Sequence, residues 1–195
     1  MRGLEGKYVG GEGRTPSFIM LVGEAPGVEE SKRGRPFVGQ AGKELTVYLR
    51  RAAMIERGTV YVTNMVKRHP PDNRDPTPAE IEEYGGILER EIAECMPTYV
   101  GALGRIAATW FMQWQEAPVM ERVHGFAYAC PRVTALTGKP AWVMPIYHPA
   151  LGLHKRPMMK QIMEDFTAFG GLVRGNKTAV WTQSAEGVYV VGGGA

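Results

Sequence analysis

Apolar runs alternate along this chain with stretches in which apolar residues recur every three or four positions. Runs whose length and β-branched content predict strands lie at residues 18–22, 59–63, 99–103 and 141–147. Helical spacing predicts helices over about residues 41–54, 77–97, 106–114 and 158–170. Such alternation is typical of an α/β fold. We therefore expect a three-layer α/β/α sandwich around a mainly parallel sheet of four to five strands.

Local signals mark some of these elements more clearly than others. Residues 77–80, Thr-Pro-Ala-Glu, match a capping box with proline at the first helical position, so a helix should begin there. Residues 28–42 are expected to form a polar loop. Weaker patterns predict an edge strand at 125–130 and a hairpin at 178–191.

The length of 195 residues suits one domain. We expect residues 1–15 to be a flexible segment, residues 16–171 to form the domain, and residues 172–195 to be a tail. The first residues are charged and glycine-rich without an apolar core, and no apolar run reaches the roughly 18 residues of a membrane span. These features predict a soluble, cytoplasmic protein, which we expect to be a monomer.

Polar side chains follow the predicted strands where each strand ends. The carboxyl ends of parallel strands meet at one sheet edge, and there the chain places Glu24, Asn64, Gly104 and His148. Taken singly, each is a common turn or structural residue. Together with Phe37, an aromatic in a loop, they suit a pocket for a planar heterocycle. Phe37 would stack on its face, Asn64 would hydrogen-bond its edge, and His148 would donate to an oxygen that gains charge.

The cysteine spacing and one loop sequence argue against several other kinds of site. Cys95 and Cys130 are the two cysteines, lie far apart and form no CxxC pair, so neither a disulfide framework nor a four-thiolate metal site is supported. Residues 39–44 differ from a phosphate-binding loop, because Glu44 follows the lysine.

The net charge is only +3. Basic residues nevertheless cluster after predicted strands: Lys32, Arg33 and Arg35; Lys67, Arg68 and Arg74; Lys155, Arg156 and Lys160.

Five segments together resemble the uracil-DNA glycosylase superfamily, and are closest to its family 4. They are residues 23–30 (GEAPGVEE), 35–42 (RPFVGQAG), 60–67 (VYVTNMVK), 102–104 (ALG) and 147–151 (YHPAL). The resemblance covers residues 18 to about 169. It implies an enzyme that flips a nucleotide out of DNA, cleaves its N-glycosidic bond and leaves an abasic site.

The resemblance also assigns roles to positions of this chain. It implies catalytic roles for Glu24, where water is activated, and for His148, which stabilises the departing base. The base-binding positions it implies are Ala25, Gly27, Glu30, Phe37 and Asn64. Residues 149–153 would wedge into the double helix, and the DNA-binding positions are Lys67, Arg68, Ala150, Leu151, Leu153, Lys155 and Arg156.

Two departures from family 4 bear on cofactor and DNA binding. That family holds an iron–sulfur cluster on four cysteines, whereas the two later positions are Arg68 and Tyr84 here and the amino terminus has no cysteine. We therefore predict no cluster and no metal. Ala150 stands where the family usually has a serine that contacts phosphate, so clamping of DNA should be weaker there.

The sequence leaves the substrate open. In the best-known branch of the superfamily an aromatic residue blocks substituents at C5 of the pyrimidine, and Gly27 stands at that place, which leaves a gap unless Glu30 or the neighbouring loop fills it. Uracil and a bulky 5-modified cytosine, as in phage DNA, are both candidates, in double- or single-stranded DNA. His69 lies where a relative traps DNA covalently, but without that relative's arginine-rich context. The alternative function is a non-catalytic DNA-binding or replication-accessory protein on the same fold.

Overall fold

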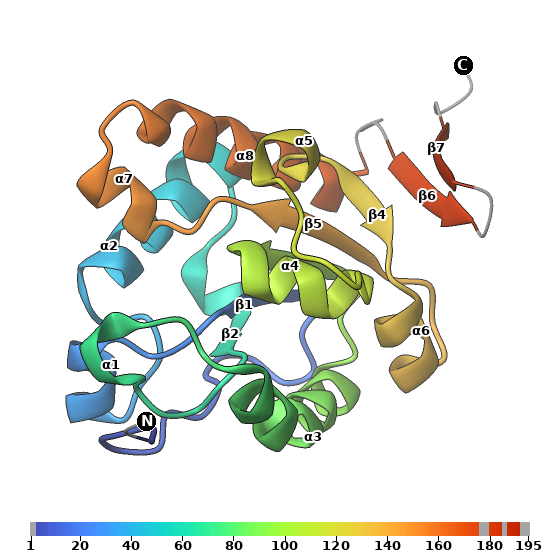
Figure 1. Ribbon diagram of the computed structural model, residues 1–195. Coiled ribbons are helices and arrows are strands. Elements are labelled where there is room, and N and C mark those ends of the chain that lie inside the picture. The colour runs from blue at the N-terminus through green and yellow to red at the C-terminus, as the bar shows by residue number, and fades with distance from the viewer. Residues whose placement is uncertain (1–2, 176–179, 185–186, 192–195) are drawn as a thin grey trace.

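A computed structural model of the chain describes residues 3–175, 180–184 and 187–191. Its strands form one sheet with the order β2-β1-β3-β5-β4-β6-β7 (Figure 1). The strands are β1 (Ile19–Gly23), β2 (Tyr61–Asn64), β3 (Tyr99–Leu103), β4 (Ala127–Ala129), β5 (Trp142–Ile146), β6 (Val180–Ser184) and β7 (Gly187–Val191).

Pairing within the sheet is mainly parallel, as predicted. The four strands β2, β1, β3 and β5 run parallel to one another, and Val22 pairs with both Thr63 and Ala102. β4 is antiparallel to β5. β6 pairs with the outer side of β4, so the strand predicted at the edge lies inside the sheet. β6 and β7 pair antiparallel like the predicted hairpin, whose connecting residues 185–186 lie outside the described residues.

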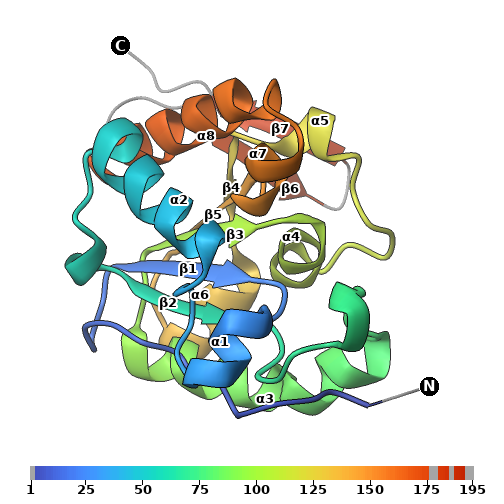
Figure 2. The same ribbon diagram turned by 90° about the vertical axis from the view of Figure 1, so that its left-hand side faces the viewer.

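Helices cover both faces of the sheet, which confirms the predicted three layers. They are α1 (Val28–Arg33), α2 (Gln40–Tyr48), α3 (Pro78–Cys95), α4 (Arg105–Met112), α5 (Met120–Val123), α6 (Pro131–Thr137), α7 (Ala150–His154) and α8 (Met158–Val173). One apolar cluster joins α2 and α8 to the sheet, and a second joins α3, α4 and α6. Figure 2 shows the sheet between these layers, with α2 and α8 above it and α3 below.

The central strand β1 is buried on both faces. Leu21 belongs to the first apolar cluster, whereas Met20 and Val22 belong to the second. Successive side chains of a strand point to opposite faces, so an uninterrupted apolar run is what a strand between two helical layers requires. Residues 19–22 therefore lie at the centre of the core, whereas Phe18, which precedes the strand, is 77% exposed. The loop that follows the strand emerges at the carboxyl edge of the sheet.

Helix boundaries follow the predicted caps in one case and depart from the prediction in another. At α3, Thr77 Oγ1 accepts from the N–H of Glu80 (3.3 Å), and Glu80 Oε2 accepts from the N–H of Thr77 (2.8 Å), which confirms the capping box. The helix predicted over 41–54 is regular only through Tyr48. A π-helical turn, Leu49–Ala53, completes it, and Met54 ends it in the left-handed region.

The loop predicted at 28–42 contains a helix, α1, so that prediction was wrong over its first six residues. Gly27 caps the helix, Gly34 ends it at φ 72°, and Glu29 pairs with Lys32 (3.2 Å) and Arg33 (3.3 Å). An acidic first turn and a basic last turn suit the helix dipole. The segment lacks an apolar period, which is why the hydrophobic pattern alone does not reveal it.

The segment before the domain, predicted to be flexible from residue 1 to 15, is held from residue 5 onward against β2 and the loop that follows β2. Glu5 bridges to His69, the N–H of Val9 donates to the carbonyl of Lys67 (2.8 Å), and Glu12 bridges to Val62. Val9 is buried at 1% exposure. This packing does not fit a flexible arm. Across the described ranges, no helix is long and apolar enough to cross a membrane.

Candidate active site

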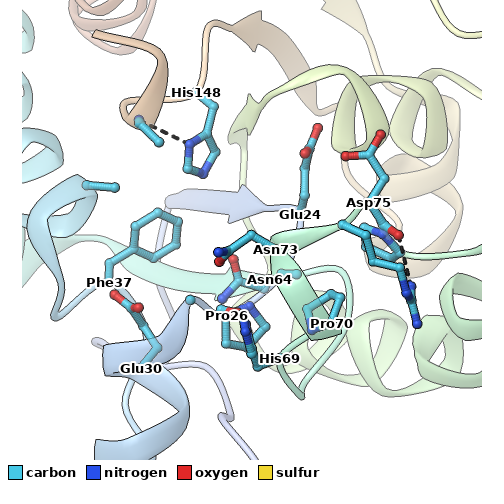
Figure 3. Close-up of a pocket in the computed structure, with 16 residues that line it drawn as sticks. Glu24, Pro26, Glu30, Phe37, Asn64, His69, Pro70, Asn73, Asp75 and His148 are labelled. Carbon is cyan, nitrogen blue, oxygen red and sulfur yellow. Dashed lines mark hydrogen bonds between the residues drawn. The ribbon is translucent and has the colours of Figure 1, made fainter. Parts of the chain in front are cut away.

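A pocket of about 250 Å³ opens at the carboxyl edge of the sheet, between β1, β2 and β5 (Figure 3). It brings together every residue predicted for catalysis and base binding: Glu24, Ala25, Gly27, Glu30, Phe37, Asn64 and His148. Ala150, from the predicted DNA-binding set, also lines it. In Figure 3, Phe37 and His148 lie on one side of the cavity and Glu24 and Asp75 on the other. The predicted meeting of strand ends is therefore confirmed.

Two glycines let Phe37 reach into this pocket. Phe37 itself has φ 52°, a left-handed conformation that is uncommon outside glycine and often found at functional sites. A Cβ atom at Gly42 would lie 1.9 Å from the Phe37 carbonyl oxygen, and one at Gly23 would lie 2.8 Å from Phe37 Cζ. The ring faces that of His148, with centroids 6.2 Å apart and planes at 28°.

Asn64 ends β2 and is almost fully enclosed, at 2% exposure. Its backbone carbonyl accepts from the ammonium of Lys67 (2.7 Å), which fixes the main chain at this strand end. A Cβ atom at Gly23 would lie only 2.5 Å from Asn64 Oδ1, so the side-chain amide also depends on glycine at that position. The side-chain amide therefore presents both a donor and an acceptor to the pocket, and the main chain that carries it is held in place (Figure 3).

Glu30 fills the space beside Gly27. Its Oε1 accepts hydrogen bonds from the N–H groups of Val38 (2.9 Å) and Gly39 (2.7 Å), and the residue is 8% exposed. A Cβ atom at Gly27 would lie 2.8 Å from Glu30 Oε2. The carboxylate of Glu30 thus fills the gap left by Gly27. This is one of the two ways of closing that gap that the sequence predicts. The same carboxylate ties α1 to the loop that carries Phe37.

Glu24 lies at the amino-terminal end of α4. Its Oε1 accepts a hydrogen bond from the N–H of Ile106 (3.0 Å). Gly104, at φ 98°, lets the chain pass close by, since a Cβ atom there would lie 2.5 Å from Glu24 Oε1. Burial raises the pKa of Glu24, and the hydrogen bond from Ile106 opposes that rise. The site holds a partly desolvated carboxylate, suited to accept a proton from water.

His148 follows β5 and is held in one tautomer. Its Nδ1 accepts a hydrogen bond from the N–H of Ala150 (3.2 Å), which places the proton of the neutral imidazole on Nε2. Burial lowers the pKa of His148 to about 4, so the ring is neutral near pH 7. The neutral ring therefore offers one N–H donor, Nε2–H, to the pocket.

The prediction that Lys67 binds DNA was wrong. Lys67 is 0% exposed, and its ammonium donates to Thr63 Oγ1, the carbonyl of Asn64 and Glu91 Oε2, each at 2.7 Å. Burial lowers the pKa of Lys67, and Glu91 opposes that shift. The lysine therefore joins β2 to α3 inside the protein. Arg68, half-buried, donates to the carbonyl of Gly6 in the amino-terminal segment.

The remaining predicted DNA-binding residues lie on and after α7, next to the pocket. Leu153 is 39% exposed, and Lys155 and Arg156 are exposed. Leu151 is half-buried and packs against the core. Because Ala150 at the start of α7 lines the pocket, this short helix joins the pocket to an exposed basic end. Contact of these residues with DNA stays a prediction.

The loop after β2 also contributes His69, Asn73, Arg74 and Asp75 to the pocket wall. The sequence suggests His69 only for covalent trapping of DNA and Arg74 only as part of a basic cluster, and it places none of the four in the pocket. His69 is 8% exposed, and its Nδ1 lies 2.8 Å from the carbonyl oxygen of Pro26. Arg74 pairs with Glu80 (2.6 Å). The proline-rich composition of this loop predicts only a connection. Its position directly after β2, whose end carries Asn64, was the available signal.

The cysteines do not fit an iron–sulfur cluster. Such a cluster needs four thiolates, and the whole chain has only Cys95 and Cys130. Both are buried in the apolar cluster under α3 and α4, where burial raises the pKa of each thiol to about 11. Arg68 contacts Gly6, and Tyr84 is buried at 7% exposure. No group of three or more potential metal ligands occurs within the described part of the chain.

Comparison with known proteins identifies a family. The model of the family described as "Uracil DNA glycosylase superfamily" matches residues 11–167. The chain is 40% identical over 167 residues to the Type-4 uracil-DNA glycosylase of Archaeoglobus fulgidus, covering 85% of this chain and 81% of that protein. It is 40% identical to the protein of the same name from Sulfurisphaera tokodaii, covering 81% and 71%. For the one from Thermotoga maritima the identity is 39%, covering 80% and 77%.

Proposed function

The chain belongs to the uracil DNA glycosylase superfamily, and on this premise we propose that it is a monofunctional DNA glycosylase that excises uracil and leaves an abasic site. The observation that carries the proposal is the convergence of Phe37, Asn64 and His148 on one pocket, with Glu24 at its far side. A stacking ring, an amide and an N–H donor together match the face and edge of a flipped pyrimidine.

The flipped base would be recognised by its face and its polar edge. Phe37 offers an aromatic surface for stacking. The amide of Asn64 can accept from N3–H of uracil and donate to O4, which leaves O2 for His148. A cavity of about 250 Å³ lies below the roughly 300–1,000 Å³ typical of sites for larger ligands, and suits a single base.

Bond cleavage would place negative charge on the departing base. When the C1′–N1 bond breaks, its electron pair goes to the base, and the sugar becomes cationic. The Nε2–H of His148 would donate to O2, where the charge of the uracil anion gathers. Glu24 would take a proton from the water whose oxygen forms the new bond to C1′. Both groups then stabilise the transition state more than the bound substrate.

The size of the base that fits is limited by Glu30. Its carboxylate lies beside Gly27, where the family resemblance places C5 of the pyrimidine, and it is held by two backbone N–H groups. This supports uracil ahead of a bulky 5-modified cytosine. A substituent at C5 would have to displace a carboxylate that has a structural task of its own.

Excision assays test the proposal directly. Duplex and single-stranded oligonucleotides carrying uracil, hypoxanthine, hydroxymethylcytosine or glucosylated cytosine would be incubated with the protein and then cleaved at abasic sites with alkali. We expect cleavage at uracil, and a loss of about 10²-fold or more in His148→Ala. Lack of product from every substrate would contradict the glycosylase function. It would leave the non-catalytic DNA-binding alternative, in which charge reversal at Lys155 and Arg156 abolishes binding while His148→Ala does not.

A further inference from the structure

We propose that Asp165, on α8, is a positioning residue for His148, acting through the backbone of Tyr147 together with His124. The inference rests on the proposed function, because it concerns the group assigned to the departing base. Asp165 does not line the pocket described above. Its carboxylate lies behind the strand end that carries His148.

Asp165 makes two hydrogen bonds inside the protein. Oδ2 accepts from the N–H of Tyr147 (3.0 Å), and Oδ1 lies 2.6 Å from Nδ1 of His124. The residue is 2% exposed. Burying a carboxylate with so little access to water costs free energy unless its oxygens are paired. The two contacts with Tyr147 and His124 supply that pairing.

Tyr147 is thereby held on two sides. Asp165 fixes its peptide N–H, and the ring of His124 contacts its phenol ring, with centroids 4.5 Å apart and planes at 43°. His124 directly follows α5, and Figure 1 shows α5 beside α8. Three segments that are distant in sequence therefore meet at the residue before His148.

The turn after His124 passes close to the carboxylate of Asp165. Gly125 has φ 73°, and a Cβ atom there would lie 3.0 Å from Asp165 Oδ1. The N–H of Gly125 donates to the carbonyl of Pro145 (2.9 Å), within β5. The turn thus binds β5 two residues before Tyr147, and glycine lets it approach both β5 and Asp165.

These contacts determine where the His148 ring lies. The N–H of Tyr147, the residue before His148, is held by Asp165, and Nδ1 of His148 is held from the other side by the N–H of Ala150 (3.2 Å). Without Asp165 the N–H of Tyr147 would lose its acceptor, and the end of β5 would be free to shift. A displacement of about 1 Å in a group that acts in the transition state can cost on the order of 10²-fold in rate.

A double-mutant cycle with His148 tests the inference. We expect Asp165→Ala to lower kcat for uracil excision about 10- to 100-fold, with KM changed less than about threefold, because His148 acts on the departing base. In a His148→Ala background the same substitution should lower kcat no more than about twofold further, since there is no imidazole left to misplace.

Conservative variants separate the two contacts of Asp165. Asp165→Asn keeps an oxygen for the N–H of Tyr147 and should recover most of kcat. His124→Ala should lower kcat by a smaller factor than Asp165→Ala. His124→Asn, whose amide nitrogen can take the place of Nδ1, should restore it. These variants also serve if Asp165→Ala fails to fold.

A matched control is Phe169→Leu, on the same helix. Phe169 is fully buried and packs toward Gly101 of β3, so its truncation destabilises the fold without removing a hydrogen bond of Asp165. Its effect on kcat should be the same in both backgrounds. Equal loss from Asp165→Ala with and without His148, or loss confined to KM, would overturn the inference while leaving the glycosylase function intact. A wild-type protein without excision activity would overturn both.

Discussion

The N–H of Ile106 donates a 3.0 Å hydrogen bond to Glu24 Oε1, and this contact anchors the carboxylate of Glu24 to the first turn of α4. It joins the loop after β1 to the helix after β3, two segments about eighty residues apart. An N–H group at a helix amino terminus has no partner within the helix, so Glu24 gives it one. The carboxylate remains half-buried, at the edge of the pocket.

The pH dependence of excision should report Glu24. Its pKa is raised by burial, so the carboxylate becomes protonated, and the rate falls, at a pH above the ordinary range of glutamate. His148, with a pKa of about 4, stays neutral over pH 5–8 and contributes no such limb. Single-turnover rates of wild type should therefore fall on the acidic side. The residual rate of Glu24→Gln should lose that limb, whereas His148→Gln should keep it. A limb that disappears in His148→Gln instead would contradict this assignment.

Substitution of Gly23 by alanine should lower the excision activity and leave the rest of the fold largely unchanged. The new Cβ atom would lie 2.5 Å from Asn64 Oδ1 and 2.8 Å from Phe37 Cζ, and would displace both base contacts. We expect uracil excision to fall about 10²-fold. Gly86→Ala is the matched control. No heavy atom lies within 4 Å of a Cβ there, and alanine in a helix should stabilise the fold by about 1 kcal/mol. Unchanged excision by Gly23→Ala would show that the two side chains do not bind the base.

Glu30→Ala and Glu30→Gln should behave differently. Alanine removes the acceptor of the Val38 and Gly39 N–H groups and releases the loop that holds Phe37, so excision of uracil should fall about tenfold or more. Glutamine retains an acceptor oxygen and should stay within a few-fold of wild type. If Glu30 limits the base at C5, wild type should excise uracil faster than 5-hydroxymethyluracil. A wild type that excises both equally would contradict that limit.

Lys67 and Lys155 should separate stability from DNA binding. Lys67→Met removes the ammonium that pairs with the buried carboxylate of Glu91, and unfolding in urea should show a loss of about 3–5 kcal/mol. Lys155→Met, at an exposed position beside α7, should leave stability unchanged. If Lys155 contacts phosphate, its loss should reduce the slope of log affinity against log salt by about 1. An unfolding free energy unchanged in Lys67→Met would contradict the buried ion pair.

The purified protein should contain no iron. Two buried cysteines cannot supply the four thiolates of a cluster. We expect no visible absorbance and no change of Tm with a chelator. Stoichiometric iron in protein purified without oxygen would contradict the prediction.

Much of the site follows from the sequence because a parallel sheet brings its carboxyl ends to one edge. Once the apolar runs are recognised as strands, Glu24, Asn64 and His148 are placed on one edge of the sheet. The strand order β2-β1-β3-β5 then brings them to one pocket. The capping box at Thr77 is equally local, since both of its hydrogen bonds join residues three apart. For these features, the covalent spacing of the chain carries the information.

Other features depend on contacts between segments that no local pattern connects. Lys67 looks like a surface cation in the sequence, and only the approach of Glu91 from α3 makes it a buried one. In the sequence Gly27 predicts a gap, but the carboxylate of Glu30, in the first turn of α1, fills that gap in the structure. Asp165 and His124 meet behind Tyr147 because α8 and α5 pack together. The sequence by itself determined which groups stand at the strand ends. The tertiary structure decided which charges are buried and which contacts hold His148, because burial and pairing depend on neighbours distant in the chain.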